Sequence, residues 1–358
     1  MARIGILGAG QLGQMLALAG IPLGMRFRFL DSAAGSPAGQ VAEHIVADYH
    51  DGAGLKQFLE ELDLVTYEFE NIPLDVVEEI SKIIPVYPPA MALEKSQDRF
   101  LEKSFFRTLG IPTPEFARAT DPGFEFPCVL KTCRMGYDGK GQFLVTNENE
   151  RSQVLKQLGD RDAIQEQYIQ FERELSLLAV RARRGETRFY PLIENTHRDG
   201  ILRKSIAPAQ DVNPGLQKSA EEYAISILNT LDYIGVLAIE FFQVDGKLLA
   251  SEMAPRVHNS GHWTIEGAVT SQFENHLRAV SGAPLGDTSP LGVCGMLNLV
   301  GGSPPVEEIL KTEGAHLHLY GKKAHPRRKI GHVTFVEKDL AELTVKLGEL
   351  EKTLIDDR

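Results

Sequence analysis

Two apolar segments joined by one turn signal constrain the fold of this chain more than any other feature. Residues 236–244 (VLAIEFFQV) and 247–253 (KLLASEM) are rich in aliphatic and aromatic residues, a composition typical of β-strands. Between them lies Asp245-Gly246, the strongest short-range signal for a β-hairpin. The sequence therefore predicts two paired strands, each of which carries one acidic residue, Glu240 or Glu252.

The register of this hairpin decides whether Glu240 and Glu252 share a face of the sheet. A two-residue turn places them on opposite faces, because side chains alternate along a strand. A three-residue loop or a bulge sets them opposite each other, where their carboxylates repel unless a cation lies between them. We expect this second arrangement with Mg²⁺ as the cation, because Mg²⁺ prefers one or two carboxylates together with substrate phosphates. The alternative is a surface hairpin with two exposed acids.

Three side chains that can bind an anion follow the hairpin directly. They are Arg256, His258 and Asn259, in the run APRVHN that begins two residues after Glu252. A cation and two hydrogen-bonding side chains this close together make a natural anion site beside a metal. Their presence favours the functional interpretation over the surface hairpin.

The composition excludes several classes of protein. The chain has 358 residues, enough for two or three domains, and its 43% hydrophobic and 24% charged residues are ordinary for a globular protein. A formal net charge of -11 argues against a general nucleic-acid surface, and no run of about 18 apolar residues predicts a membrane span. Cys128, Cys133 and Cys294 form no Cys-x-x-Cys pair, which fits a reducing cytoplasm. We expect a cytoplasmic protein with no nucleic-acid or membrane partner.

Short apolar segments and helices alternate over the first 95 residues. We expect strands at residues 3–7, 26–30, 62–69 and 85–87, with a glycine turn and then a helix after the first of them. This alternation is typical of a doubly wound α/β domain. Ser96 is predicted to cap a helix that Gly110 ends. Another cluster of glycine and proline, at residues 282–290, predicts a boundary before a small β-rich C-terminal unit.

The glycine turn matches the fingerprint of a dinucleotide-binding domain. Gly8, Gly10 and Gly13 have its spacing, and Asp31 stands 21 residues after Gly10, where an acid would bind the adenosine ribose. One hypothesis is therefore an NAD(P)-dependent oxidoreductase, and the plainer alternative is a strand-turn-helix that needs glycine for its geometry. Against the oxidoreductase stands a second, different set of nucleotide-binding features further along the chain.

This second set begins at Lys131, which ends an apolar strand, and continues into the glycine-rich segment GYDGKGQ (136–142). Glycines let backbone amides approach phosphate oxygens, and lysine supplies compact positive charge. The segment is no Walker loop, because it lacks the final Lys-Ser/Thr. Taken alone it fits a hairpin tip equally well. A strand at 163–169 and the acids that follow it then offer backbone groups for an adenine edge and a carboxylate for ribose hydroxyls.

In this order of motifs the chain resembles the ATP-grasp superfamily and, within it, the N5-carboxyaminoimidazole ribonucleotide synthetases. The resemblance covers essentially the whole chain. It is carried by GILGAGQLGQML (5–16), TYEFENIP (66–73), QDRFLEK (97–103), MGYDGKGQ (135–142), FEREL (171–175), HRDGIL (197–202), APRVHNSGHWT (254–264) and PRRKIGH (326–332). It implies an ATP-grasp fold, α/β at the start and α+β later. Its parts would be a Rossmann-like pre-ATP-grasp domain at 1–95, an ATP-grasp domain at 96–285 with a lid around 113–175, and a β-rich C-terminal domain at 286–358.

The resemblance also implies roles for individual residues. The ATP site would comprise Arg99, Lys131, Gly136, Tyr137, Asp138, Gly139, Lys140, Gly141, Gln142, Glu166, Gln167, Tyr168, Ile169, Glu174, His197, Ser251 and Glu252. Mg²⁺ would bind to Glu240 and Glu252, and bicarbonate to Arg256, His258 and Asn259, which with Lys131 would be the catalytic residues. The ribonucleotide would bind to Gln11, Glu70, Tyr137, Asp138, Lys322, Arg328 and Lys329.

The activity implied is that of an ATP-dependent carbon–nitrogen ligase. ATP and bicarbonate would give ADP and carboxyphosphate, and the amine of 5-aminoimidazole ribonucleotide would capture the carboxyl group. Such enzymes are expected to be homodimers. The alternatives are a formate-dependent glycinamide ribonucleotide transformylase or a biotin carboxylase within the superfamily, and outside it the oxidoreductase or a non-catalytic nucleotide-binding module.

Three positions depart from the pattern of the family. They are Cys133, His325 and Arg327, where we expect other residues. These departures leave the individual phosphate contacts open but keep a basic site near the C-terminus.

Overall fold

The first 95 residues form a parallel α/β unit, as their alternation of apolar segments and helices predicts. The structure is a computed structural model that describes residues 2–136, 139, 141–302 and 304–356. The strand order in this unit is β3-β2-β1-β4. Its strands are β1 (Arg3–Leu7), β2 (Arg26–Asp31), β3 (Glu43–Val46) and β4 (Leu64–Tyr67). Its helices are α1 (Gln11–Gly20), η1 (Ile21–Leu23), η2 (Pro37–Gln40), α2 (Gly52–Leu59) and α3 (Leu74–Ser81).

One strand predicted in this unit is absent, and another strand was missed. The segment 85–87 is no strand and contributes only an isolated bridge between Val86 and Val65. The short strand β3 was not predicted, because its four residues, EHIV, do not alternate between polar and apolar and give a weak signal.

The helix predicted to start at Ser96 begins later and is preceded by another. These are α4 (Ala90–Ser96) and α5 (Arg99–Thr108). Asp98 caps α5 by accepting hydrogen bonds from the amides of Phe100 and Leu101, whereas the Ser96 hydroxyl donates back to a carbonyl of α4. The carboxylate satisfies two of the free amides at the helix start, which explains why Asp98 is the cap.

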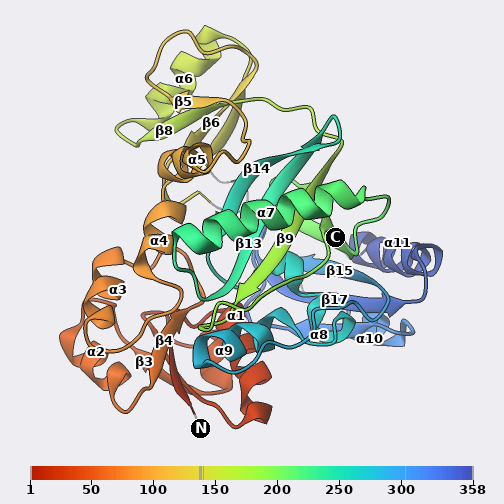
Figure 1. Cartoon of the computed structure of the whole chain (residues 1–358). Coiled ribbons are helices and arrows are strands. Elements are labelled where there is room, and N and C mark those ends of the chain that lie inside the picture. Colours follow the sequence, from red (N-terminus) through yellow and green to blue (C-terminus); the bar gives the residue numbers. More distant parts are fainter. Residues whose placement is uncertain (1, 137–138, 140, 303, 357–358) are drawn as a thin grey trace.

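A small antiparallel sheet forms a separate lobe at the top of Figure 1. Its strand order is β5-β8-β6-β7. The elements are β5 (Phe116–Arg118), β6 (Cys128–Thr132), β7 (Gln142–Val145), α6 (Glu148–Leu158) and β8 (Ala163–Gln167). Leu130, Val145 and Leu158 form part of its own small core.

A large, mainly antiparallel sheet occupies the centre of the molecule. In the described part of the chain its order is β14-β13-β9-β11-β12-β15-β17-β16, with β10 paired to β9. The strands are β9 (Arg173–Arg181), β10 (Thr187–Phe189), β11 (Ile193–Arg198), β12 (Ile201–Ala207), β13 (Gly235–Val244), β14 (Lys247–Ala254), β15 (Val293–Val300), β16 (His316–Leu319) and β17 (Lys329–Glu337). Because β12 pairs with β15, the C-terminal strands extend the same sheet.

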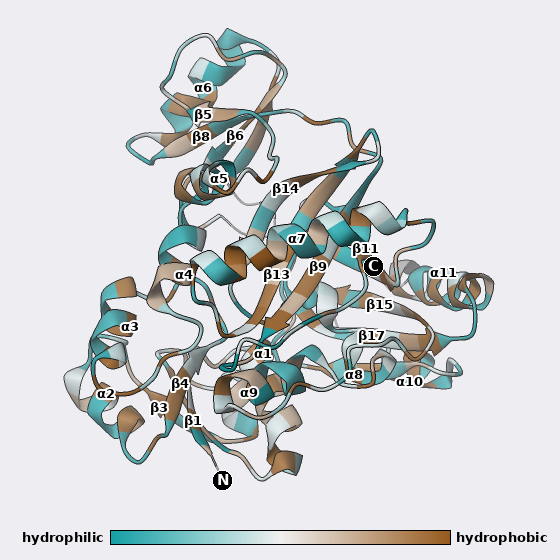
Figure 2. Cartoon of the chain, in the orientation of Figure 1, coloured by the Kyte–Doolittle hydropathy of each residue, from teal (hydrophilic) through white to brown (hydrophobic). Residues whose placement is uncertain are grey.

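Helices cover this sheet on its faces and edges (Figure 1). They are α7 (Pro214–Thr230), η3 (Asn259–Gly261), α8 (Thr264–Gly267), α9 (Gln272–Ser281), α10 (Val306–Lys311) and α11 (Leu340–Asp356). Figure 2 shows largely hydrophobic central strands and an α7 with both hydrophobic and hydrophilic residues. Ala220, Ala224 and Ile227 of α7 belong to the core cluster that includes Leu177 and Leu237 of the sheet.

We predict that Ile227→Ala lowers the free energy of unfolding by about 2–5 kcal/mol, through lost burial and the cavity left behind. Ile227 is fully buried, whereas Ile225 on the same helix is 42% exposed. Ile225→Ala is the matched control and should change stability by less than about 0.5 kcal/mol. Urea unfolding followed by circular dichroism measures both. Equal effects for the two variants would contradict the packing of α7 on the sheet.

Candidate functional site

The β13–β14 hairpin brings Glu240 and Glu252 opposite each other, as predicted. The connection is the two-residue turn Asp245-Gly246, with positive φ at both residues, and alone it would separate the two acids. The register shifts after Glu240, so that Phe241 pairs with Ala250 while Glu240 pairs with Glu252. Ser251 is the extra residue of this bulge. The predicted shared face is therefore confirmed, and it arises from a bulge and not from a longer loop.

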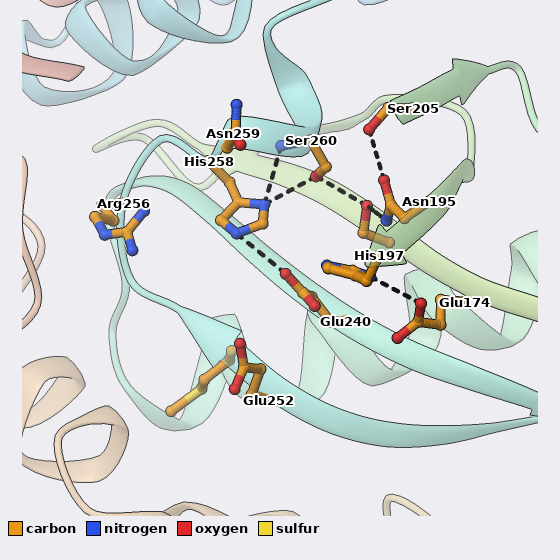
Figure 3. A network of polar contacts seen from close by, with 12 residues as sticks. Glu174, Asn195, His197, Ser205, Glu240, Glu252, Arg256, His258, Asn259 and Ser260 are labelled. Carbon is orange, nitrogen blue, oxygen red and sulfur yellow. Dashed lines mark hydrogen bonds and ion pairs between the residues drawn. The ribbon is translucent and has the colours of Figure 1, made fainter. Parts of the chain in front are cut away.

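Each of the two acids also contacts a cationic or polar partner, and Figure 3 shows the contact of Glu240 with His258. An ion pair of 3.0 Å joins Glu252 to Arg99 of α5. The ring nitrogen Nε2 of His258 lies 3.1 Å from Oε1 of Glu240. Burial raises the pKa of Glu240, but the hydrogen bond and charge of His258, with smaller effects from more distant cations, outweigh burial and lower the pKa to about 2. Glu240 is therefore a carboxylate at neutral pH.

A third acid, Glu102, lies beside Glu252 and was not predicted. It is buried in the first turn of α5, and its Oε1 accepts a hydrogen bond of 2.7 Å from the amide of Met253. Burial and the charge of Glu252 raise the pKa of Glu102 to about 8. Its position three residues after Arg99, on the same helix face, is the only signal that could have indicated it.

The predicted ATP residues Lys131 and Glu166 meet in a buried ion pair. They lie on the paired strands β6 and β8, and Lys131 Nζ is 2.7 Å from Glu166 Oε2. Lys103 of α5, which was not predicted, lies 3.6 Å from the same oxygen and is fully buried. Burial raises the pKa of Glu166, but the charges of the two lysines outweigh it and lower the pKa to about 2.

Two further predicted ATP residues, Glu174 and His197, lie on neighbouring strands of the central sheet. The His197 ring nitrogen Nδ1 is 2.8 Å from Glu174 Oε2 (Figure 3). Burial lowers the pKa of His197, but the hydrogen bond to Glu174 and the charges of Glu240 and Glu252 outweigh burial and raise it. A histidine that is protonated more readily than usual, beside several carboxylates, suits a nucleotide phosphate that also approaches them.

Two described glycines of the glycine-rich segment lie close to α5 and to the turn between β11 and β12. Arg99 donates a hydrogen bond of 3.2 Å to the carbonyl of Gly136. Gly139 has φ of +74°, and a Cβ there would lie 2.9 Å from the carbonyl oxygen of Asp199, so glycine is required. Gln142 pairs with Lys131 across β6 and β7. Tyr137, Asp138 and Lys140 were also predicted to bind ligands, and they lie outside the described residues.

The remaining predicted ATP residues lie at the end of β8, directly after it, and within β14. Gln167 ends β8, Tyr168 and Ile169 follow it in the connection to β9, and Ser251 is the bulge residue of β14. Tyr168 is 43% exposed, so its ring is open to solvent.

Glu68 occupies the glycine turn of the amino-terminal unit. Its carboxylate accepts hydrogen bonds from the amides of Gly10 (2.8 Å) and Gly13 (3.1 Å). Asp31 accepts from the amide of Ala9 at 3.2 Å. These amides are the groups that would hold a pyrophosphate in a dinucleotide-binding domain. Their occupation by a protein carboxylate argues against the oxidoreductase hypothesis.

The predicted ribonucleotide and bicarbonate residues meet where the three units of the chain join. Arg256 forms an ion pair with Glu70, and Lys322 donates a hydrogen bond to Gln11. Burial raises the pKa of Glu70, but the charge and hydrogen bond of Arg256 outweigh burial and lower it. Asn259 exchanges two hydrogen bonds, of 3.1 and 2.7 Å, with Asn298, which was not predicted.

The basic residues of the segment 326–332 differ in their exposure and in their contacts. Arg328 is exposed, just before β17, while Lys329 begins β17 and lies close enough to contribute to the electrostatics of Glu240. Arg327, one of the departures, donates to the carbonyl of Asp199 at 3.0 Å. Burial raises the pKa of the Cys133 thiol to about 11, so this thiol is neutral.

The arrangement fits a metal ion that arrives with a substrate. Within the described residues no group of three or more histidine, cysteine, aspartate or glutamate side chains could hold a metal. The pair Glu240 and Glu252 matches the one or two carboxylates that Mg²⁺ usually takes from a protein, because this ion keeps waters and binds nucleotide phosphates in its other positions.

We predict that Glu166→Gln destabilises the protein by about 3–5 kcal/mol near neutral pH, because it leaves Lys103 and Lys131 buried without their carboxylate. The pKa of Glu166 falls on folding from 4.5 to about 2. Its contribution is therefore present above pH 4.5 and is lost as the pH falls toward 2. Wild type should lose this contribution on acidification and the variant should not.

Urea unfolding of both proteins between pH 7 and pH 3 tests this expectation. Glu115→Gln is the control, because Glu115 forms an exposed ion pair of 3.6 Å with Arg107. The same pH dependence in wild type and Glu166→Gln would contradict the assignment.

Comparison with known proteins supports the same organisation. Family models match three parts of the chain: a ribonucleotide synthetase preATP-grasp domain at residues 1–97, an ATP-grasp domain at 104–273 and a phosphoribosylaminoimidazole carboxylase C-terminal domain at 294–346. The ATP-grasp match includes both strands of the acidic hairpin and Arg256.

Similar proteins cover almost the full length of the chain. It is 51% identical over 357 residues to the N5-carboxyaminoimidazole ribonucleotide synthase of Pseudomonas aeruginosa, which covers 98% of each chain. The crystal structure of the N5-carboxyaminoimidazole ribonucleotide synthetase from Thermus thermophilus superposes with a TM-score of 0.93 at 54% identity, over 98% of each chain. The N5-carboxyaminoimidazole synthase of Aspergillus clavatus in complex with ADP and 5-aminoimidazole ribonucleotide superposes with a TM-score of 0.92 at 30% identity, over 99% of each chain.

Identity of this extent over the whole chain, together with the matching fold and domain models, shows the family. The chain belongs to the N5-carboxyaminoimidazole ribonucleotide synthases, which are ATP-grasp ligases.

Proposed function

We propose that this chain carboxylates 5-aminoimidazole ribonucleotide with bicarbonate at the expense of ATP. The products are N5-carboxyaminoimidazole ribonucleotide, ADP and phosphate, in purine biosynthesis. The observation that carries the proposal is the bulge that sets Glu240 opposite Glu252. This acidic pair lies between the cations proposed for ATP and the residues proposed for bicarbonate.

The ATP side of the site is formed by both sheets. Lys131 and Lys103 supply positive charge for the phosphates, and Glu166 keeps both lysine side chains in place. Glu174 and His197 approach from the central sheet. The glycine loop would contribute backbone amides to phosphate oxygens. Together these groups would orient the terminal phosphoryl group toward the hairpin, and positioning is most of what phosphoryl transfer requires of a protein.

Glu240 and Glu252 would hold Mg²⁺ together with the nucleotide phosphates. When bound, the ion would neutralise charge that builds up on the transferring phosphoryl group. The two carboxylates at neighbouring positions repel each other, and Arg99 and His258 offset only part of that repulsion. A divalent cation therefore complements the charge of the hairpin.

The carboxylation proceeds in two steps. A bicarbonate oxygen attacks the γ-phosphorus of ATP, the bond to the ADP oxygen breaks, and carboxyphosphate forms. The exocyclic amine of the ribonucleotide then forms a carbon–nitrogen bond with the carboxyl carbon, phosphate leaves, and the amine loses a proton. Arg256 and His258 would bind the bicarbonate oxygens by charge-assisted hydrogen bonds.

The ribonucleotide would bind where the amino-terminal and C-terminal regions meet. Lys322 and Gln11 already contact each other there, and Glu70 and Arg256 adjoin them. Lys329 and Arg328 would add positive charge for the ribonucleotide phosphate. The contact between Lys322 and Gln11 brings residues from opposite ends of the chain together, which supports their assignment to one substrate.

We further expect the enzyme to work as a homodimer in the cytoplasm. The three cysteines are buried and free of disulfide bonds, which suits a reducing compartment. No helix in the described part of the chain is long and apolar enough to cross a membrane. Sedimentation equilibrium measures the oligomeric state directly.

The requirement for each substrate tests the reaction class. ADP release should require bicarbonate, 5-aminoimidazole ribonucleotide and Mg²⁺ together, and formate should not replace bicarbonate. Glu252→Gln should lose most of the Mg²⁺-dependent turnover, since it removes one of two carboxylate ligands, and should keep its circular dichroism spectrum. Full turnover with formate and glycinamide ribonucleotide, or with Glu252→Gln, would contradict the proposal.

Substitution of Lys322 separates the site proposed for 5-aminoimidazole ribonucleotide from the site proposed for ATP. Lys322→Ala should raise the KM for 5-aminoimidazole ribonucleotide about 10- to 100-fold, because one charge-assisted contact contributes roughly 1.5–3 kcal/mol. The KM for ATP should stay within about twofold of wild type. Lys323→Ala is the matched control, because the adjacent Lys323 is exposed. Equal increases in both KM values for Lys322→Ala would show that Lys322 does not belong to the ribonucleotide site.

A further inference from the structure

A row of buried polar side chains crosses the central sheet and ends at His258 (Figure 3). Its members are Ser205 on β12, Asn195 on β11, Ser176 on β9 and Ser260 on η3. Ser205, Ser176 and Ser260 are fully buried, and Asn195 is 5% exposed. None of the four was predicted from the sequence. Buried polar groups are stable only when they are hydrogen-bonded, so the row must be satisfied internally.

The strand registers place these side chains next to one another. Asn195 pairs with Ser205 across β11 and β12. Ser176 pairs with Glu240 across β9 and β13, so the row passes directly beside the acidic hairpin. Ser260 follows His258 by two residues and lies over Ser176. The row therefore links the middle of the sheet to the proposed bicarbonate pocket.

The hydrogen bonds of the row all run toward His258. The Ser205 hydroxyl donates to Asn195 Oδ1 at 2.7 Å, and Asn195 Nδ2 donates to Ser176 Oγ at 2.9 Å. Ser176 then donates to Ser260 Oγ at 2.9 Å. A hydroxyl has one proton to donate, so Ser260 gives its own to His258 Nδ1, 2.9 Å away.

A backbone amide gives independent support for a hydrogen bond that runs toward His258 Nδ1. The backbone N–H of Ser260 also points at His258 Nδ1, at 3.3 Å. A backbone amide can only donate, so Nδ1 must present its lone pair. In the neutral ring the proton is then on Nε2, the nitrogen that lies 3.1 Å from Glu240 Oε1.

We propose that Ser176 and Ser260 are positioning residues that hold His258 in the tautomer with its proton on Nε2. In this state His258 presents a hydrogen-bond donor to the reaction centre. If the chain is the carboxylase proposed above, His258 then donates to a bicarbonate or carboxyphosphate oxygen, and Nε2 is not the base that removes the amine proton. The tautomer itself does not depend on the identity of the substrate.

The wild-type protein tests the tautomer directly. Nitrogen-15 NMR of protein labelled at histidine distinguishes a protonated from an unprotonated ring nitrogen, and His258→Asn identifies the signal. We expect an unprotonated Nδ1 and a protonated Nε2 in the neutral ring. A neutral His258 with its proton on Nδ1 would overturn the proposal. This measurement needs no substrate, so it separates a failure of the inference from a failure of the proposed carboxylation.

Ser176→Ala tests the role of the row, because Ser176 does not contact His258. Loss of its hydroxyl frees Ser260 to rotate, and we expect a mixture of His258 tautomers. We also expect kcat to fall about 5- to 10-fold, the effect of weakening one hydrogen bond, while the KM for ATP stays within about twofold of wild type. Thr288→Val is the matched control, because it removes a buried hydroxyl that donates to the carbonyl of Phe189 at 2.6 Å.

Thermal unfolding of both variants checks that they are folded at the assay temperature. A Ser176→Ala protein with the wild-type His258 spectrum, or with the wild-type kcat, would overturn the assigned role. A Thr288→Val protein with the same loss of kcat as Ser176→Ala would overturn it as well. If Ser176→Ala does not fold, the wild-type spectrum still decides the tautomer.

Discussion

The pairing of Glu240 with Glu252 is the constraint on which the rest of the site depends. It exists because β14, which pairs with the strand that contains Glu240, carries one extra residue, Ser251. Two carboxylates held this close raise the energy of the folded chain unless cations surround them. Arg99 supplies part of that charge from α5, and the rings of His258 and His197 lie nearby, on the segment after β14 and on β11. The remaining negative charge suits a divalent cation that binds with the nucleotide.

Ion pairs that are buried or partly buried connect the parts of the chain around this hairpin. Arg99 joins α5 to β14, Arg256 joins the end of β14 to Glu70 of the amino-terminal unit, and Glu166 joins the small sheet to α5 through Lys103. Breaking the fully buried pair of Lys103 and Glu166 would leave a buried charge and destabilise the protein by about 3–5 kcal/mol. The residues proposed to bind substrates therefore also hold the units together, and ligand binding and domain arrangement depend on the same contacts.

Uncharged polar groups orient side chains of the site. The row from Ser205 to Ser260 directs its donors at one ring nitrogen of His258. Glu68 similarly satisfies the amides of the glycine turn, so a motif that usually binds a pyrophosphate here stabilises the fold. Both cases show that a short motif acquires its chemistry from the side chains that reach it from elsewhere in the chain.

The sequence by itself determined the local structure and the identity of most site residues. It predicted the strands at 3–7 and 26–30, the β13–β14 hairpin and the α/β character of the first unit, because these depend on apolar periodicity and turn residues within a short window. The resemblance of its motifs predicted Lys131, Glu166, Glu174 and His197, which the structure brings together in two pairs.

Only the tertiary structure decided the contacts between distant segments. The bulge at Ser251 reverses the register that the Asp245-Gly246 turn alone would impose, and no local signal marks it. Lys103, Glu102, Glu68 and the row of buried serines acquire their partners from strands and helices far away in the sequence. Hydrogen bonds and ion pairs of this kind depend on which side chains share a buried volume. Packing between the sheets decides which side chains share that volume, so a pattern along the chain cannot predict these contacts.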